Sequence, residues 1–244
     1  MIAAPPHTSP QFAWTVEARA ALLATVPFFA PLPPATIGEL ATLFRAKVVQ
    51  RGDFVFHEGQ PADTVHIAAT GRLKIIRTTA EGRQVVLRLI QPAEPFGVSG
   101  GWGAVAYPAS ARALDHAVVL QLPAREFTRY LHRHPALALA VINDIGARLR
   151  EAEERILDAE TANVEARIAR TLLRLVGPAT AGGAARSVAL SRQDLADLTG
   201  TTLSTASRVL SAWHRRGVIL ALRERVTILD HAALATLAGE GGGG

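Results

Sequence analysis

Small hydroxyl side chains and one arginine alternate with apolar residues in the segment 202–213, TLSTASRVLSAW. If the segment is helical, its periodicity gathers four residues on one buried side, namely Ala206, Val209, Leu210 and Trp213. The same periodicity leaves four others on the outer side near the N-terminal end, namely Leu203, Ser204, Ser207 and Arg208. An arginine can donate two parallel hydrogen bonds to O6 and N7 of guanine, and a serine is short enough to reach a base edge or a methyl group. The spacing therefore predicts a helix that contacts DNA bases.

The residues before this segment have the pattern of a shorter helix. Ser191 and Asp194 have the spacing of a capping box, with aspartate in place of the usual glutamate or glutamine, and they open the helix SRQDLADL. Leu195 and Leu198 are expected to face the core, and Ala196 is small enough to let a second helix cross closely. The pattern predicts the first helix of a helix-turn-helix.

A tight turn and a hairpin complete this unit. Gly200 breaks the first helix, and Thr202 can cap the second one, where it joins the expected DNA-contacting set. The following GVILALRERVTIL offers two short β runs around residues 223–225, as in a winged helix. Ser191 and Arg192 lie near free backbone N–H groups at the start of the first helix and suit contact with phosphate. The alternative is a helical hairpin with polar outer residues and no DNA contact.

Residues 135–170 are rich in Ala, Leu, Glu and Arg and contain a single glycine, Gly146. Apolar residues recur there at alternating steps of three and four, namely Ile142, Ile145, Leu149, Ala152, Ile156 and Ala159. Asn163 falls on the next position of this heptad stripe. A long, narrow seam flanked by RLREAEER charges suits a partner helix and predicts a homodimer. An amphipathic helix that packs on its own domain is the alternative.

The first half of the chain, to about residue 125, has the pattern of an antiparallel β domain. Glycines punctuate short β-prone runs such as AKVVQ, TVHIAA, RLKIIRTT and RQVVLRLI, and TTAEGRQ (78–84) has the pattern of a hairpin turn. Upstream, residues 15–26 and 34–44 are expected to be helical. This order predicts an α+β protein whose first part is a sandwich or barrel.

Composition excludes several classes of function. The sequence contains no cysteine, which rules out disulfides, cysteine-ligated zinc and an iron–sulfur cluster held by thiolates. No apolar run approaches the roughly 18 residues of a membrane span, and the N-terminus lacks the pattern of a secretory signal, so we expect a cytoplasmic protein with no membrane partner. The net charge of +5 permits nucleic-acid binding but does not establish it.

These features together resemble the CRP/FNR superfamily of transcription regulators. The resemblance covers roughly residues 25–238 and is carried by the glycine-punctuated β segments, the long helix and LSRQDLADLTGTTLSTASRVLSAW. It implies an N-terminal antiparallel β-roll like that of cyclic-nucleotide-binding domains, a dimerisation helix and a C-terminal winged helix-turn-helix. The predicted divisions are a leader and helix (1–25), the β-roll (26–132), the dimerisation helix (133–163), the DNA-binding domain (164–238) and a disordered tail (239–244).

Within the superfamily, the chain most resembles the nitric-oxide-responsive regulators of denitrification, the NnrR and DNR types. The segments that carry this resemblance are TGTTLSTASRVLSAW, RQVVLRLIQPAEPFGVSGG and YPASARA. Arg208 matches the family's guanine-reading arginine and Ser207 its neighbouring serine. Ser204 stands where family members usually carry a glutamate that contacts cytosine, so we expect a half-site related to TTG but not identical with it.

The resemblance also bears on the effector. The family's cyclic-nucleotide pocket uses a glutamate and an arginine, and Val98 and Ala109 stand at these positions, which makes cyclic AMP improbable. The branch resemblance implies nitric oxide sensing through haem, whose iron usually needs an axial histidine. His66 is the first candidate and His116 the second, and the alternative for His66, which the residue type favours, is that it replaces an inward-packing aromatic residue of the family. His7 is a further candidate in the leader.

The predicted partners are palindromic double-stranded DNA, a second copy of the chain, and RNA polymerase if the protein is an activator. The predicted targets are denitrification or nitrogen-oxide genes, and the sensing of another small molecule is the nearer alternative. A remote alternative is a metalloenzyme of the cupin type, with His57, Glu58, His66 and His116 as ligands. That alternative leaves the helix-turn-helix pattern unexplained.

Overall fold

The computed structural model describes most of the chain. The described residues are 14–79, 82, 84–98, 105–161, 163–176 and 186–239, without the side chains of 158–161. Several predictions therefore lie outside the description, namely those for the leader at 1–13, for the tail at 240–244 and for the side chain of Ala159. The chain forms two compact units, Met1–Ile75 with Leu89–Gly146 and Ile76–Arg88 with Ala147–Gly244.

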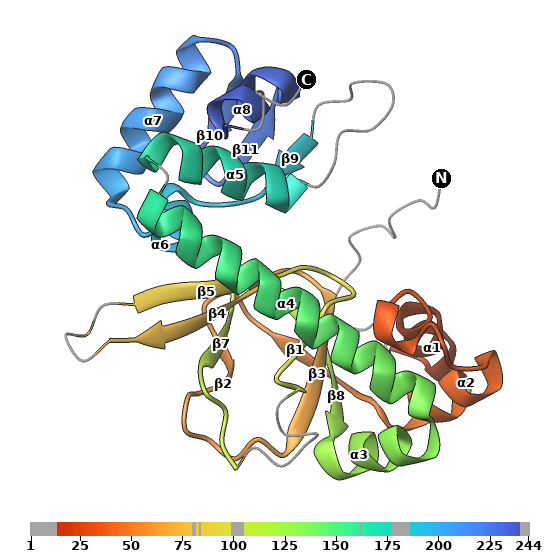
Figure 1. Cartoon of the computed structure of the whole chain (residues 1–244). Helices are drawn as coiled ribbons and strands as arrows, with labels where there is room; N and C mark the ends of the chain where they lie inside the picture. The colour runs from red at the N-terminus through yellow and green to blue at the C-terminus, as the bar shows by residue number, and fades with distance from the viewer. Residues whose placement is uncertain are drawn as a thin grey trace. The chain divides into compact units, whose positions relative to one another are not determined.

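A β-roll of two four-stranded sheets makes up most of the first unit, while the segment Ile76–Arg88, which holds parts of two of its strands, belongs to the second unit (Figure 1). One sheet has the order β1-β8-β3-β6, with strands β1 (Arg45–Val49), β8 (Ala117–Pro123), β3 (Thr64–Thr70) and β6 (Pro95–Phe96). The other has the order β2-β7-β4-β5, with strands β2 (Phe54–Phe56), β7 (Ser110–Ala113), β4 (Leu73–Thr78) and β5 (Gln84–Ile90). The pairs β1–β8, β3–β8, β3–β6 and β2–β7 are antiparallel, which confirms the predicted class of sheet.

Side chains on the two faces of β3 and β8 enter two different cores. Val65, Ile67, Leu120 and Leu122 face the helices of this unit and pack with Phe127. The alternate residues on these strands, such as Ala68 and Val119, face the interior of the roll, where they meet Phe56, Phe96 and Tyr107. Because both faces are covered, β3 carries a nearly continuous apolar run instead of a strict alternation.

Short helices cover the outer face of the β1-β8-β3-β6 sheet. They are α1 (Val16–Leu23), η1 (Pro27–Phe29), α2 (Pro34–Leu43) and α3 (Ala124–Arg133). The first two α-helices confirm the helices expected at 15–26 and 34–44. The side chain of Thr15 caps α1 by accepting a hydrogen bond from the N–H of Ala18.

A single helix of 27 residues, α4 (Pro135–Thr161), follows (Figure 1). Pro135 occupies the first helical position, where its missing N–H costs nothing. The helix ends earlier than the heptad pattern predicts, because Asn163 caps the next helix: its side-chain oxygen accepts a hydrogen bond from the N–H of Ala166 at 2.8 Å. Asn163 is therefore a capping residue and not a heptad position.

The second unit holds the remaining helices around a small sheet (Figure 1). Its helices are α5 (Val164–Val176), α6 (Arg192–Thr199), α7 (Leu203–Arg215) and α8 (His231–Leu237). The sheet has the order β10-β11-β9, with strands β10 (Ile219–Leu222), β11 (Arg225–Ile228) and β9 (Arg186–Val188). In the part of the chain that the structure describes, no helix is long and apolar enough to cross a bilayer.

Candidate nucleic-acid interface

The helix pair α6–α7 has the local geometry that the sequence predicts. Ser191 caps α6, and its hydroxyl accepts from the N–H of Asp194 at 3.1 Å and donates to the Asp194 carboxylate at 2.6 Å. Gly200 ends the helix with a φ of 62°, a left-handed conformation that favours glycine. Leu195 and Ala196 are fully buried, whereas Leu198, which was expected in the core, is only half-buried.

A cluster of three hydroxyl groups holds the start of α7, which we call the recognition helix. Oγ1 of Thr202 accepts from the N–H of Thr205 at 3.2 Å and lies 2.9 Å from the Thr205 hydroxyl. It also lies 3.0 Å from Oγ of Ser204. Sequence reasoning identified Thr202 as a cap but missed Thr205, whose position at the third residue of the helix was the available signal.

The two sides of the recognition helix separate as predicted. Its buried residues are Ala206, Val209, Leu210 and Trp213. On the opposite side Leu203 is 46% exposed, Ser204 and Arg208 are exposed, and Ser207 is half-buried. An exposed arginine beside short side chains near a helix N-terminus can approach the base edges of a major groove.

The hairpin after the recognition helix forms a wing. Strands β10 and β11 pair antiparallel from Ile219–Ile228 to Leu222–Arg225, so Arg223 and Glu224 form a two-residue connection. The carbonyl of Glu224 accepts from the N–H of Leu190 at 3.0 Å, which fixes the connection beside the start of α6. Two arginines of the wing, Arg223 and Arg225, are exposed and available to phosphate.

Further basic groups lie at the other end of the recognition helix. Arg215 and Arg216, which sequence reasoning did not single out, are exposed there, and the run HRRG was their signal. Arg192, at the first position of α6, is half-buried. The second unit thus presents arginines on α6, α7 and the wing, which is the distribution that sequence-independent contact with a phosphate backbone requires.

The interior of the β-roll was the expected place for an effector. Val98 and Ala109, at the positions where the family's cyclic-nucleotide pocket carries charge, are 6% and 5% exposed. Arg112 lies on β7, three residues after Ala109. Its Nε donates to the carbonyl of Gly52 at 2.7 Å, and its guanidinium group lies over the ring of Phe54. A nucleotide phosphate would therefore meet apolar side chains at both positions, where its charge would lack a partner.

His66 lies among aromatic rings in the interior of the β-roll. It is 2% exposed, and its ring stacks on Phe96 and lies tilted against Phe56, with centroid separations of 5.1 Å each. A Cβ atom on Gly97 would lie only 2.9 Å from Nδ1 of His66. Burial, with a smaller contribution from Lys47, lowers the pKa of His66 to about 3, so the imidazole is neutral. The aromatic surroundings fit a histidine that replaces a core aromatic residue. Nδ1 of His66 is buried and has no hydrogen-bond partner among the described residues, and haem ligation by His66 stays a prediction.

The other candidate ligands do not gather with His66. His116 is exposed in the loop between β7 and β8, and His57 is exposed and stacks on Phe54 at 4.1 Å. Among the described residues, no three His, Cys, Asp or Glu side chains lie close enough to hold a metal ion. The ligand set that the cupin-type metalloenzyme requires is therefore not formed, while His7 lies outside the description.

Comparison with known proteins finds a family model for each of two parts of the chain. Residues 46–134 match the model of the cyclic nucleotide-binding domain, and residues 166–237 match that of the Crp-like helix-turn-helix domain. A transcription activator, Anr of Pseudomonas aeruginosa, is 28% identical over 80% of this chain and 81% of its own. The structure of FixK2 from Bradyrhizobium japonicum shares the fold, with a TM-score of 0.71 at 22% identity over 80% of this chain and 96% of that one.

A solved structure of higher identity connects the whole arrangement to one family. It is a transcriptional regulator of the CRP family from Thermus thermophilus, 30% identical over 79% of this chain and 96% of that one, with a TM-score of 0.65. The family matches, this relative and the exposed arginine face of α7 agree on a regulator that binds DNA. The chain belongs to the CRP/FNR family of DNA-binding transcription regulators.

Proposed function

We propose that the protein acts as a homodimer on a palindromic operator, with one recognition helix in the major groove of each half-site. The observation that carries the proposal is the apolar stripe of α4. In a single chain Ile142, Ile145, Leu149 and Ile156 are 61%, 41%, 59% and 64% exposed, and Ala152 is half-buried. Four large exposed apolar side chains at heptad spacing are unfavourable in water and favourable against a second copy of the helix.

The stripe is wider than the heptad pattern alone. Leu139 and Leu157 are 62% and 60% exposed and extend the apolar surface of α4 beyond the predicted positions. By contrast, Leu137 and Val141 are buried against the helices of the first unit. The start of α4 therefore packs on its own unit, as the alternative interpretation expects, while the stripe supports pairing with a partner.

Base recognition centres on Arg208. Its guanidinium group is exposed on the recognition helix, whereas the hydroxyl of Ser204 lies within the capping cluster at 3.0 Å from Thr202. With no glutamate at position 204 to accept from cytosine N4, the helix discriminates less strongly at that base pair than a glutamate-bearing relative would. This supports a half-site related to TTG, with guanine read by Arg208.

DNA binding needs a dimer whose two recognition helices are spaced one DNA turn apart, about 34 Å. An effector would regulate DNA binding if it changed the fraction of dimers that have this spacing. Contact with RNA polymerase would then make the protein an activator, and occlusion of a promoter would make it a repressor. Chromosomal DNA as the target places the protein in the cytoplasm.

Nitric oxide as the signal, and nitrogen-oxide genes as the targets, rest on the motif resemblance within the family. The relatives reported above are not described as nitric oxide regulators, and haem ligation by His66 stays a prediction. An absorption spectrum of the reduced protein mixed with haem, before and after nitric oxide, tests this signal. A stoichiometric Soret band that shifts with the gas supports it, and His66→Ala and His116→Ala then locate the ligand. Absence of specific haem uptake directs the search to other small molecules.

The dimeric operator complex is tested with purified protein and labelled duplexes. Fluorescence anisotropy compares a palindrome that holds two TTG-related half-sites with a duplex that holds one, and sedimentation equilibrium gives the mass of the protein. A dimer that binds the palindrome much more tightly than the single half-site supports the proposal. A monomer that binds both duplexes equally well contradicts it.

A further inference from the structure

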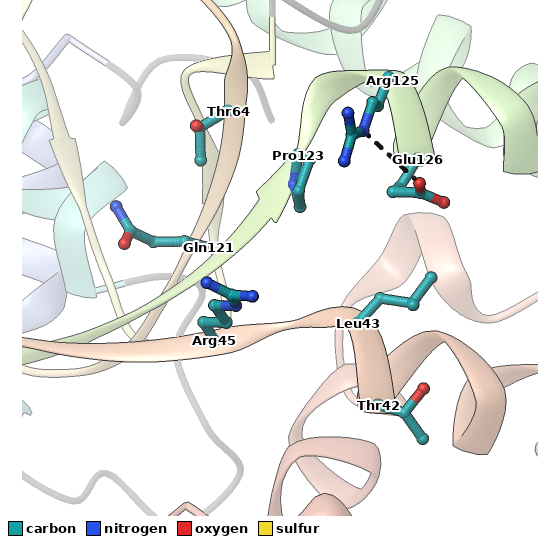
Figure 2. Close-up of a pocket in the computed structure, with 8 residues that line it drawn as sticks. All are labelled: Thr42, Leu43, Arg45, Thr64, Gln121, Pro123, Arg125 and Glu126. Carbon is teal, nitrogen blue, oxygen red and sulfur yellow. Dashed lines mark ion pairs between the residues drawn. The ribbon is translucent and has the colours of Figure 1, made fainter.

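A pocket of about 480 Å³ lies at one end of the β1-β8-β3-β6 sheet, where β1 begins and β8 leads into α3 (Figure 2). The residues that line it are Thr42, Leu43, Arg45, Thr64, Gln121, Pro123, Arg125 and Glu126. In Figure 2, Arg125 and Glu126 lie on the α3 side of the pocket, and Arg45 lies with Leu43 and Thr42 on the other side. The volume is within the range of small-molecule sites, roughly 300–1,000 Å³.

The strand register shows how polar side chains come to line this pocket. Arg45 lies directly opposite Gln121, and Gln121 lies directly opposite His66 on the next strand. Residues opposite one another on antiparallel strands project from the same face of a sheet. Arg45 and Gln121 therefore lie on the face that carries the roll interior, but at its polar, exposed end and apart from the buried positions of Val98 and Ala109.

Two of the polar groups have unused hydrogen-bonding capacity. Within the described part of the chain, neither the guanidinium group of Arg45 nor the side-chain amide of Gln121 has a hydrogen-bond or ion-pair partner. Arg45 is exposed and Gln121 is half-buried, so a ligand can reach both. A guanidinium group presents donors in a fork that matches the oxygens of a carboxylate or a phosphate.

The charge around the pocket favours an anion. Its single carboxylate, Glu126, forms ion pairs with Arg129 and, at 3.7 Å, with Arg125. Lys47, two residues along β1 from Arg45, adds a positive charge on the same face. The N-terminus of α3 also borders the pocket. Its cap is Pro123, the N–H of Ala124 donates to the carbonyl of Asp63 at 2.7 Å, and no side chain caps the helix, so the positive end of its dipole contributes here.

We propose that this pocket binds a small anionic molecule through carboxylate or phosphate oxygens, with Arg45 as its main partner and Gln121 as a second donor. The site is separate from the recognition helix, and it does not depend on the proposed dimer or operator.

Isothermal titration calorimetry on the full chain, at low ionic strength, tests the site with citrate as the carboxylate probe and pyrophosphate as the phosphate probe. We expect one or both probes to bind with a stoichiometry of one per chain, and Arg45→Ala to weaken this binding about tenfold or more, because it removes charge-assisted hydrogen bonds. Gln121→Leu should weaken binding to a smaller extent. The probe that binds more tightly identifies the class of the natural ligand.

Two controls separate this site from general attraction of polyanions. Arg133→Ala removes an exposed arginine in the last turn of α3 and should leave binding unchanged. Arg208→Ala removes an arginine of the recognition helix and should also leave it unchanged. The proposal is overturned if neither probe binds at millimolar concentration, or if Arg45→Ala weakens binding no more than Arg133→Ala does. It is also overturned if only Arg208→Ala abolishes binding, because the anion then occupies the DNA-binding surface.

Discussion

Arg208 is the residue whose position carries most of the proposed base recognition. It is exposed, whereas the next residue along the helix, Val209, is buried. Ser204 and Thr202 hold each other in the capping cluster, which leaves the arginine as the long side chain able to reach into a groove. Recognition at this scale depends on one planar group with two parallel donors.

The first prediction concerns this group. We compare the binding free energy of the operator with that of a duplex in which the guanine is replaced. Arg208→Ala should reduce the difference between the two by about 1–3 kcal/mol. The fold should change little, because the side chain is exposed. Fluorescence anisotropy on both duplexes measures the difference. Arg208→Lys keeps the charge but loses the paired donors, so it should also lose discrimination. Intact discrimination in Arg208→Ala would show that the recognition helix is wrongly assigned.

His66 provides a prediction on pH. Its pKa is about 3 in the fold against 6.5 in the unfolded chain, so below pH 6.5 the unfolded chain binds a proton that the folded chain does not. Stability is therefore complete above pH 6.5 and falls as the pH decreases toward 3, by up to about 1.4 kcal/mol per pH unit. His66→Phe keeps an aromatic ring in the cage and should remove this component. Urea unfolding of both proteins at pH 7.5 and pH 5 measures it, and equal pH dependence would contradict the assignment.

At the scale of single elements, helix ends and helix faces are specified by short stretches of sequence. Ser191, Thr202 and Asp230 each cap a helix through a side-chain oxygen that accepts from a backbone N–H three residues later. Gly200 supplies the left-handed residue between α6 and α7. These local bonds place the recognition helix at a defined point in the chain before any long-range contact is considered.

Loss of the cap on the recognition helix should lower the stability of the protein. Thr202→Ala leaves the N–H of Thr205 without its acceptor and should cost about 1 kcal/mol of unfolding free energy. Ser211→Ala removes a hydroxyl from the middle of the same helix, where it caps nothing, and should cost no stability. Thermal unfolding followed by circular dichroism compares the two. Equal losses would mean that the capping cluster contributes nothing.

The stripe on α4 yields a prediction about assembly. Leu149→Asp places a charge in the middle of the proposed helix pair, and desolvating this charge should dissociate the dimer at micromolar concentration. Arg150→Asp introduces the same residue at the next position, outside the stripe, and should leave the dimer intact. Sedimentation velocity distinguishes the two. A dimer that persists in Leu149→Asp would require an interface elsewhere in the molecule.

At the scale of the whole molecule, the two units have separate chemistry on one chain. The first unit contains most of the β-roll and the Arg45 pocket, and the second contains the recognition helix and the wing. The helix α4 begins in one unit and ends in the other, so it is one of the covalent routes by which an effector signal could reach DNA. Regulation by a change of population requires that the effector bind the two states with different affinity.

Dimeric binding predicts a dependence on half-site spacing. Two recognition helices related by a two-fold axis need half-sites about one helical turn apart, so inserting 5 base pairs between them should turn one half-site to the opposite face of the duplex. We expect the affinity to fall to that of a single half-site. Inserting 10 base pairs returns both half-sites to the same side of the duplex but leaves them one helical turn too far apart. Anisotropy titrations on the three duplexes measure this. Equal affinity for all of them would contradict a rigid dimeric reader.

The sequence by itself determined the features that depend on near neighbours in the chain. The caps at Ser191 and Thr202, the turn at Gly200 and the buried side of α7 follow from hydrogen bonds and periodicity within a few residues, and the structure confirms them. The role of Asn163 was missed, because a heptad position and a helix cap compete for the same residue and only the path of the chain into α5 distinguishes them.

The tertiary structure decided what depends on pairing between distant strands. A histidine in a β-prone run could be a ligand or a core residue, and the enclosure of His66 by Phe56 and Phe96 settled its environment. The pocket joins Arg45 to Gln121, which are far apart in sequence and are brought together by the β1–β8 register. The periodicity of the sequence does not predict such placements. Burial and strand register are set by the free energy of the whole core and not by the spacing of neighbouring residues.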